Sequence, residues 1–187
     1  MKKIFDNIYG KKFNLVELNL DYLNDMFEYS SDDRLYEHFE FPPQKNYQKT
    51  KDYLEDLIKR SNRNDAYWWF IQTKQNSKVI GSFGLHEIDQ RKGCCEISYA
   101  LSPKYWGSGA FREILNLVLK TLFNDFNFHR VSAVTMTKNY RSINSLKNVG
   151  FQEEGVFRDF YLDSEGIRFD ATSLALIASD YQKKNIN

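Results

Sequence analysis

The spacing of apolar positions changes along the chain, and each change marks a predicted element of secondary structure. Short runs rich in aromatic and β-branched residues, bounded by Gly, Asn and Asp, are typical of strands. After a glycine-rich turn the spacing becomes helical, because Ile114, Leu117, Val118 and Leu122 recur at i, i+3, i+4 and i+8. The predicted strands are 13–18, 66–73, 78–87, 94–101, 131–137, 151–162 and 167–178. The predicted helices are 21–30, 46–60, one between Gly109 and Phe126, and 139–148, with a shorter helical piece at 35–39.

The order of these elements predicts the fold class. The three consecutive strands between residues 66 and 101 are joined by short turns, which is typical of an antiparallel meander. The strand–helix–strand unit from Cys94 to Thr137 then requires one parallel pair. We therefore expect an α/β (α+β) fold, a mixed and mostly antiparallel sheet of about seven strands flanked by about four helices. No repeat or linker divides the chain, so 1–187 is expected to form a single domain.

Composition and charge exclude several classes of function. The 187 residues contain 26 lysines and arginines against 25 acidic residues, and a net charge of +1 gives no electrostatic basis for binding nucleic acid. No apolar run has the length of a membrane span or a signal peptide. Cys94 and Cys95 are adjacent, and the three histidines lie far apart in sequence, so no zinc site is indicated. We expect a cytoplasmic monomer or homodimer that binds no metal, nucleic acid or membrane.

A glycine turn precedes the long apolar helix. The first amides of a helix lack internal acceptors and carry the positive end of its dipole, so Gly107-Ser108-Gly109 suits the close approach of an anion. The alternative is a tight turn that binds nothing. No Gly-Lys-Ser/Thr follows, and Arg112 stands where a dinucleotide motif has its third glycine, so ATP and NAD are poorly supported.

Two motifs give the chain a specific resemblance. The segment Tyr105-Trp106-Gly107-Ser108-Gly109-Ala110-Phe111-Arg112-Glu113 resembles the coenzyme A pyrophosphate loop of the GNAT N-acetyltransferases, and most closely the RimJ/RimL type that acetylates ribosomal-protein N-termini. A second motif, Asn139-Tyr140-Arg141-Ser142 followed by Gly150-Phe151, stands at the distance the family shows. The resemblance runs from about Phe13 to Tyr181. Phe111 departs from it, because the wider superfamily prefers Gly or Ala there.

The resemblance implies an acetyl-CoA-dependent N-acetyltransferase in which a primary amine attacks the thioester directly within a ternary complex. It also implies that the central parallel strands splay apart, with a bulge near 99–101. The residues it assigns to acetyl-CoA are strand residues beside the pantetheine arm (Tyr99, Ala100, Leu101), the amides of the pyrophosphate loop (Trp106, Gly107, Ser108, Gly109, Ala110, Phe111), and Asn139 on the pantetheine.

Each candidate catalytic residue has more than one interpretation. Ser142 stands where relatives carry a hydroxyl near the sulfur, so it is the candidate general acid, although it also suits an ordinary first-turn serine of a helix. Asn139 likewise suits a helix N-cap. For the base, Tyr161 occupies the position at which some relatives place a carboxylate, and Glu96 on a central strand is another candidate. Both also fit strand residues without a catalytic role.

Several classes of acceptor are also compatible with the sequence. Tyr36, Phe39, Glu40 and Phe41 lie in the region that lines the acceptor cleft of relatives, and Glu40 suits attraction of a cationic amine. The aromatic run 67–70 fits either an acceptor pocket or the core. The branch resemblance favours a protein N-terminal α-amine. The alternatives are a small amine such as an amino sugar, amino acid or antibiotic, a non-catalytic acyl-CoA-binding module, and a structural domain without a ligand.

Overall fold

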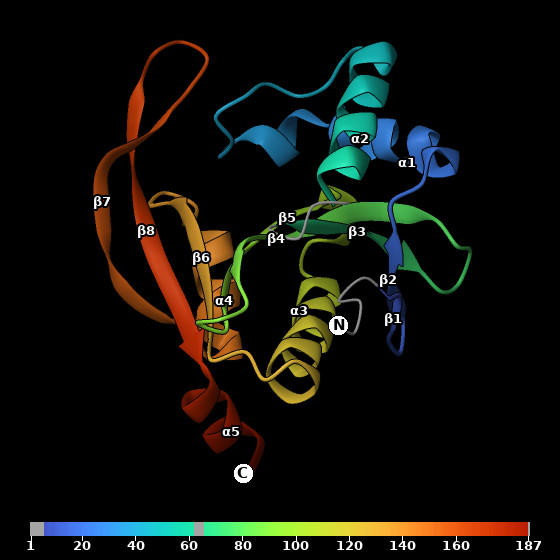
Figure 1. The fold of residues 1–187 in the computed structure, drawn as a ribbon. Coiled ribbons are helices and arrows are strands. Elements are labelled where there is room, and N and C mark those ends of the chain that lie inside the picture. Colours follow the sequence, from blue (N-terminus) through green and yellow to red (C-terminus); the bar gives the residue numbers. More distant parts are fainter. Residues whose placement is uncertain (1–5, 62–65, 187) are drawn as a thin grey trace.

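One mixed sheet organises the molecule. The computed structural model describes residues 6–61 and 66–186, and Figure 1 shows helices on both faces of a strongly twisted sheet. Its eight strands follow the order β1-β2-β3-β4-β5-β6-β8-β7. They are β1 (Ile8–Tyr9), β2 (Phe13–Glu17), β3 (Tyr67–Thr73), β4 (Val79–Asp89), β5 (Cys94–Leu101), β6 (Arg130–Met136), β7 (Gln152–Leu162) and β8 (Arg168–Ile177). The seven predicted strands are confirmed, and the two-residue β1 adds an eighth.

Helices pack on each face and form two separate cores. The α-helices are α1 (Leu23–Ser30), α2 (Tyr47–Ser61), α3 (Ala110–Lys120), α4 (Tyr140–Val149) and α5 (Ala178–Ile186), and α3 continues into a π-helical turn at Thr121–Asp125. Apolar residues of α1 and α2 pack on one face, and those of α3 and α4 pack on the other. The predicted helical piece at 35–39 is instead a 3₁₀ helix, η2 (Asp33–Tyr36), and α5 was not predicted.

The aromatic run on β3 belongs to the core. All four residues from Tyr67 to Phe70 are buried. Successive strand side chains point to opposite faces, so Tyr67 and Trp69 join the core under α3, whereas Trp68 and Phe70 join the core under α1 and α2. This alternation supports the core interpretation of the run over the acceptor-pocket interpretation.

The parallel pair separates after three residues. β5 and β6 pair at Cys94–Arg130, Cys95–Val131 and Glu96–Ser132, and no further pairing between them is present in the described sheet. β6 instead continues along β8 as far as Met136. The predicted splay of the central parallel pair is thus confirmed, and it leaves the β6-facing backbone edge of β5 without a strand partner beyond Glu96.

The predicted bulge at 99–101 was wrong. Pairing between β4 and β5 is regular through Gly81–Leu101, Ser82–Ala100 and Phe83–Tyr99, and the irregularity lies between His86 and Asp89. The stacked rings of Phe83 and Tyr99 lie 6.0 Å apart, which supports this regular register. β5 stays paired with β4 and β6 stays paired with β8, so the sheet opens between β5 and β6.

Candidate active site

The glycine turn before α3 presents open backbone amides. Gly107 and Gly109 have φ values of 72° and 83°, a conformation that glycine adopts without steric cost. A Cβ on either residue would meet nothing within 4 Å, so the space above the turn is open to a ligand. Within the described structure, the amides of Gly107, Gly109, Phe111 and Arg112 donate to no protein acceptor. Four free donors at the positive end of a helix suit a pyrophosphate.

The other predicted amides of this loop are already engaged. Trp106 donates its amide to the carbonyl of Pro103 at 3.3 Å, and Ser108 donates to the carbonyl of Tyr105 at 3.4 Å. The amide of Ala110 donates to the hydroxyl of Ser108, also at 3.3 Å. Gly107, Gly109 and Phe111 are therefore the predicted residues that can offer an amide to a phosphate, and Arg112 is an addition.

Phe111 does not close the loop. Its ring packs against the ring of Tyr99, with centroids 4.3 Å apart, and the side chain is partly buried against the core. The ring thus points inward while the amide stays at the turn. A bulky residue at this position is compatible with an open anion site.

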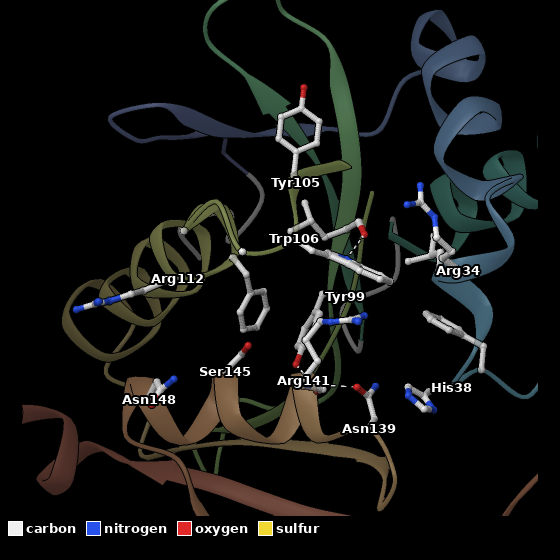
Figure 2. A pocket seen from close by; sticks show the side chains of 17 residues that line it. Arg34, His38, Tyr99, Tyr105, Trp106, Arg112, Asn139, Arg141, Ser145 and Asn148 are labelled. Atoms are coloured by element: carbon white, nitrogen blue, oxygen red, sulfur yellow. Dashed lines mark hydrogen bonds between the residues drawn. The ribbon is translucent and has the colours of Figure 1, made fainter. Parts of the chain in front are cut away.

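A cavity of about 570 Å³ extends from the glycine turn along α4, from its cap residue Asn139 to Asn148 in its last turn. In Figure 2, Arg112 and Asn148 lie at one end of this cavity, and Arg34 and His38 lie at the other, with Tyr99 between them. Of the residues predicted to contact acetyl-CoA, those that line the cavity are Tyr99, Leu101, Trp106, Gly107, Gly109, Phe111 and Asn139. Ala100, Ser108 and Ala110 do not line it.

Ser142 is hydrogen-bonded to a buried tyrosine. Its Oγ lies 2.6 Å from the hydroxyl of Tyr99, and both residues line the cavity. Burial raises the pKa of Tyr99, so this hydroxyl keeps its proton at neutral pH. Asn139 caps α4, since its Oδ1 accepts the amide of Ser142 at 3.1 Å. The N-cap interpretation of Asn139 is confirmed, and the hydroxyl of Ser142 faces Tyr99.

Trp106 and Arg141 connect the two halves of the splayed sheet. The indole Nε1 of Trp106 donates to the carbonyl of Leu101 at 2.9 Å, on β5. The guanidinium of Arg141, from α4, lies 3.6 Å above the Trp106 ring, and Figure 2 shows this stack beside Tyr99. No carboxylate pairs with Arg141 among the described residues. Its charge is therefore available to an anionic ligand.

The two strand candidates for the base lie outside the cavity lining. Tyr161 donates its hydroxyl to the carbonyl of Val134 at 3.1 Å, and burial, with the charges of Glu96 and Glu40 as further causes, raises its pKa to about 12. Burial, assisted by Glu87, raises the pKa of Glu96. Neither residue lines the cavity with Ser142.

The predicted acceptor residues form an aromatic cluster with one member in the cavity. The rings of Tyr36, Phe39 and Phe41 lie between 5.1 and 5.9 Å apart, and only Phe39 lines the cavity. Oε1 of Glu40 accepts the amide of Leu162 at 3.0 Å. Figure 1 shows the segment before α2 near the β7–β8 hairpin, so in this structure Glu40 connects these two segments.

The comparisons with known proteins agree with this geometry. The family model described as Acetyltransferase (GNAT) domain matches residues 12–152. The chain belongs to the GNAT acetyltransferase family. It is 27% identical over 176 residues to the uncharacterized N-acetyltransferase p20 of Bacillus licheniformis, covering 94% of this chain and 98% of that protein.

Two further relatives have named acceptors. The [ribosomal protein uS5]-alanine N-acetyltransferase of Escherichia coli strain K12 is 31% identical over 117 residues, covering 62% of this chain and 60% of that enzyme. The spermidine N-acetyltransferase of Vibrio cholerae, solved with CoA and spermine, superposes with a TM-score of 0.77 at 20% identity, covering 91% of this chain and 98% of that one. This GNAT protein is thus an acetyl-CoA-dependent N-acetyltransferase of the predicted mixed fold.

Other classes of site are not found in the described part of the chain. In residues 6–61 and 66–186, no group of three His, Cys, Asp or Glu side chains is placed to hold a metal ion. Over the same ranges, no helix combines the length and apolar character that crossing a membrane requires.

Sequence reasoning missed part of the cavity lining of this GNAT enzyme. The additional residues are Arg34, Leu35, His38, Tyr105, Arg112, Arg141, Ser145 and Asn148. A signal was available on α4, because Ser142, Ser145 and Asn148 recur every three residues and therefore lie near one helix face. No comparable signal marks Arg34 and His38, since the loop that holds them has no regular period.

Proposed function

We propose that this GNAT enzyme transfers the acetyl group of acetyl-CoA to the α-amine of a protein N-terminus, by direct attack in a ternary complex. One observation carries the choice of amine: among the described residues that line the cavity there are three arginines and no carboxylate. Arginines remain protonated at every physiological pH. The cavity therefore suits an amine that loses its positive charge easily.

The pKa of the amine distinguishes the classes of acceptor. A protein α-amine has a pKa of about 7.7–8.0, so a sizeable fraction is neutral near pH 7.5. A lysine-type amine, at about 10.4, is almost wholly charged, and a polyamine carries several such charges. No carboxylate lines the cavity to attract a polycation, and Arg141, which has no carboxylate partner in the described chain, repels one. The uS5-alanine enzyme of Escherichia coli is a relative whose named acceptor matches this expectation.

The glycine turn is proposed as the pyrophosphate site. The free amides of Gly107, Gly109, Phe111 and Arg112 would donate to its oxygens. The unpaired edge of β5 and the cap residue Asn139 flank the gap in which the pantetheine would lie.

Ser142 is the proposed general acid. Its hydroxyl lies in the same cavity as the glycine turn and is held by Tyr99 at 2.6 Å. As the carbon–sulfur bond of the thioester breaks, Ser142 would give a proton to the leaving sulfur, and Tyr99 would hold the serine hydroxyl in position. The thioester supplies the acetyl group that the amine nitrogen receives.

A small α-amine with an anionic group, such as a free amino acid, is the second candidate. Arg141 favours it, because this guanidinium lines the cavity without a carboxylate partner in the described chain. A carboxylate of the acceptor would supply that partner. The same observation disfavours an aminoglycoside-like antibiotic, which brings further positive charge.

A panel of acceptors tests the proposal. The purified protein is supplied with acetyl-CoA and, separately, a peptide beginning with alanine, free alanine, and spermidine, and free thiol is measured. We expect the highest kcat/KM with the peptide, a lower value with alanine and the lowest with spermidine. Faster acetylation of spermidine would overturn the α-amine proposal. Binding of acetyl-CoA without transfer to any amine would indicate the acyl-CoA-binding module instead.

We also propose that the protein works in the cytoplasm. Cys94 and Cys95 are both free, and reduced thiols are typical of that compartment.

A further inference from the structure

His38 is the one imidazole side chain of the cavity lining among the described residues. Of the 17 lining residues, none is Asp, Glu, Lys or Cys. The three arginines stay protonated, tyrosine hydroxyls already hold their protons, and Ser and Asn do not titrate in this range. Imidazole is the side chain that changes charge between pH 5 and 8. We infer that His38 is the general base that deprotonates the acceptor amine, an inference that rests on the proposed function.

The position of His38 fits this role. His38 and Asn139 both line the cavity, and Figure 2 shows His38 at the end away from Arg112. Asn139 caps the helical turn that carries Ser142, so base and acid belong to one cavity and come from different elements. The imidazole is half-buried, and its ring nitrogens make no hydrogen bond within the described structure. Both nitrogens are therefore available to an incoming amine.

The charged neighbours do not compete for the proton. Those that share the cavity lining with His38 are Arg34 on η2, Arg141 on α4 and Arg112 on α3. Asp32 holds Arg34 in an ion pair of 2.6 Å. The acidic residues closest in sequence, Glu37 and Glu40, are exposed and outside the lining, and Glu40 is bonded to Leu162.

The proton balance of the transfer is complete with these groups. His38 takes one proton from the ammonium form of the acceptor, and the neutral nitrogen forms a bond to the acetyl carbon. As the carbon–sulfur bond breaks, the sulfur takes a proton from the hydroxyl of Ser142. Ser142 then takes a proton from the attacking nitrogen. The nitrogen of the product amide therefore keeps a single hydrogen. The imidazolium of His38 then gives its proton to water. The products are the acetylated amine, free CoA thiol and one released proton.

The test is the pH dependence of kcat/KM for the His38→Gln variant. The acceptor is a peptide beginning with alanine, and kcat/KM is measured between about pH 6.5 and pH 9, on either side of the α-amine pKa of about 7.7–8.0. At about pH 6.5 roughly 3–6% of the α-amine is neutral, and the variant can use only that fraction, so it should lose about 15- to 30-fold there. Above it the amine is already neutral, so the variant should approach the unaltered protein. A structural role would lower activity equally at every pH.

Control variants distinguish a general base at His38 from a structural role and from a base at Glu96 or Tyr161. His129→Gln makes the same change at an exposed residue outside the cavity lining and should leave the profile unchanged. Added imidazole should restore activity at low pH to His38→Ala, which also shows that the variant is folded. A loss independent of pH, or a pH-dependent loss in Glu96→Gln or Tyr161→Phe but not in His38→Gln, would overturn the assignment. If the unaltered protein acetylates no amine, the proposed function fails, and this inference fails with it.

Discussion

The two ends of the cavity are built from different parts of the chain. At the α3 end, backbone amides of a glycine turn face open space, and their direction follows from two positive φ values and the start of a helix. At the other end, side chains of η2 and its following loop face those of α4. The chemistry of the first end depends on the conformation of the backbone, whereas the chemistry of the second depends on which side chains line it.

Because the two ends depend on different features, we expect substitutions to impair acetyl-CoA binding and proton transfer separately. A change of backbone conformation or charge at the glycine turn should weaken acetyl-CoA binding and leave the proton-transfer groups in place. A change at Ser142 or His38 should leave binding in place and slow the chemical step. Any variant that impairs both steps equally would show that the division is wrong.

The largest effect is expected from Gly109→Glu. The new side chain would occupy the open space above the turn and place a carboxylate where the pyrophosphate is proposed to bind. Two like charges about 4 Å apart near a protein surface repel by up to about 4 kcal/mol, which corresponds to a loss of affinity of up to about a thousandfold. Calorimetric titration with acetyl-CoA measures it.

The matched control is Gly166→Glu. Gly166 has a φ of 82° and the same open space, but it lies in the turn between β7 and β8. It should carry the same backbone strain and keep its affinity for acetyl-CoA. Equal losses in the two variants would attribute the effect to strain and contradict the pyrophosphate site.

Ser142→Ala should come next. The variant lacks the hydroxyl that Tyr99 holds, so kcat should fall by about 10²-fold or more, whereas the Kd for acetyl-CoA should stay close to that of the unaltered protein. Ser145→Ala, on the same helix and in the same cavity, is the control and should change kcat little. Full activity of Ser142→Ala would remove Ser142 as the acid and leave Tyr99 as the hydroxyl at this place in the cavity.

The smallest effect concerns Glu96, outside both ends of the cavity. Its pKa is raised in the folded protein by burial and by Glu87. Below the unfolded pKa both states are protonated, and as pH rises the folded state ionises less readily, so stability is lost through the folded pKa. Glu96→Gln should therefore have a higher thermal midpoint at pH 7, with the difference shrinking towards pH 4. A difference independent of pH would contradict this.

Most of the fold could be predicted because its signals are local. Turn residues and alternation marked the meander, helical spacing marked α3, and the strand–helix–strand order required the parallel pair. β1 was missed because two residues carry no period, and its existence depends on pairing with β2. The bulge was misplaced because register between β4 and β5 depends on contacts such as the Phe83–Tyr99 stack.

The candidate site, like the fold, has features that could be predicted from local sequence and features that depend on tertiary packing. The glycine turn could be predicted, because glycine spacing before a helix specifies backbone geometry. Which amides are free could not, because it depends on the hydroxyl of Ser108 and on two neighbouring carbonyls. His38 was missed as a site residue because its place opposite α4 is set by the packing of an irregular loop. Glu96 and Tyr161 were chosen for their strand positions, and their distance from the cavity is a tertiary property.

One titration series with acetyl-CoA tests whether the two ends of the cavity have separate roles. Heats of binding are measured for the unaltered protein, Gly109→Glu and His38→Gln at the same pH. We expect Gly109→Glu to lose most of its affinity and His38→Gln to bind as the unaltered protein does. Undiminished binding by Gly109→Glu, or an equal loss in His38→Gln, would contradict a cavity with a backbone end for the cosubstrate and a side-chain end for the amine.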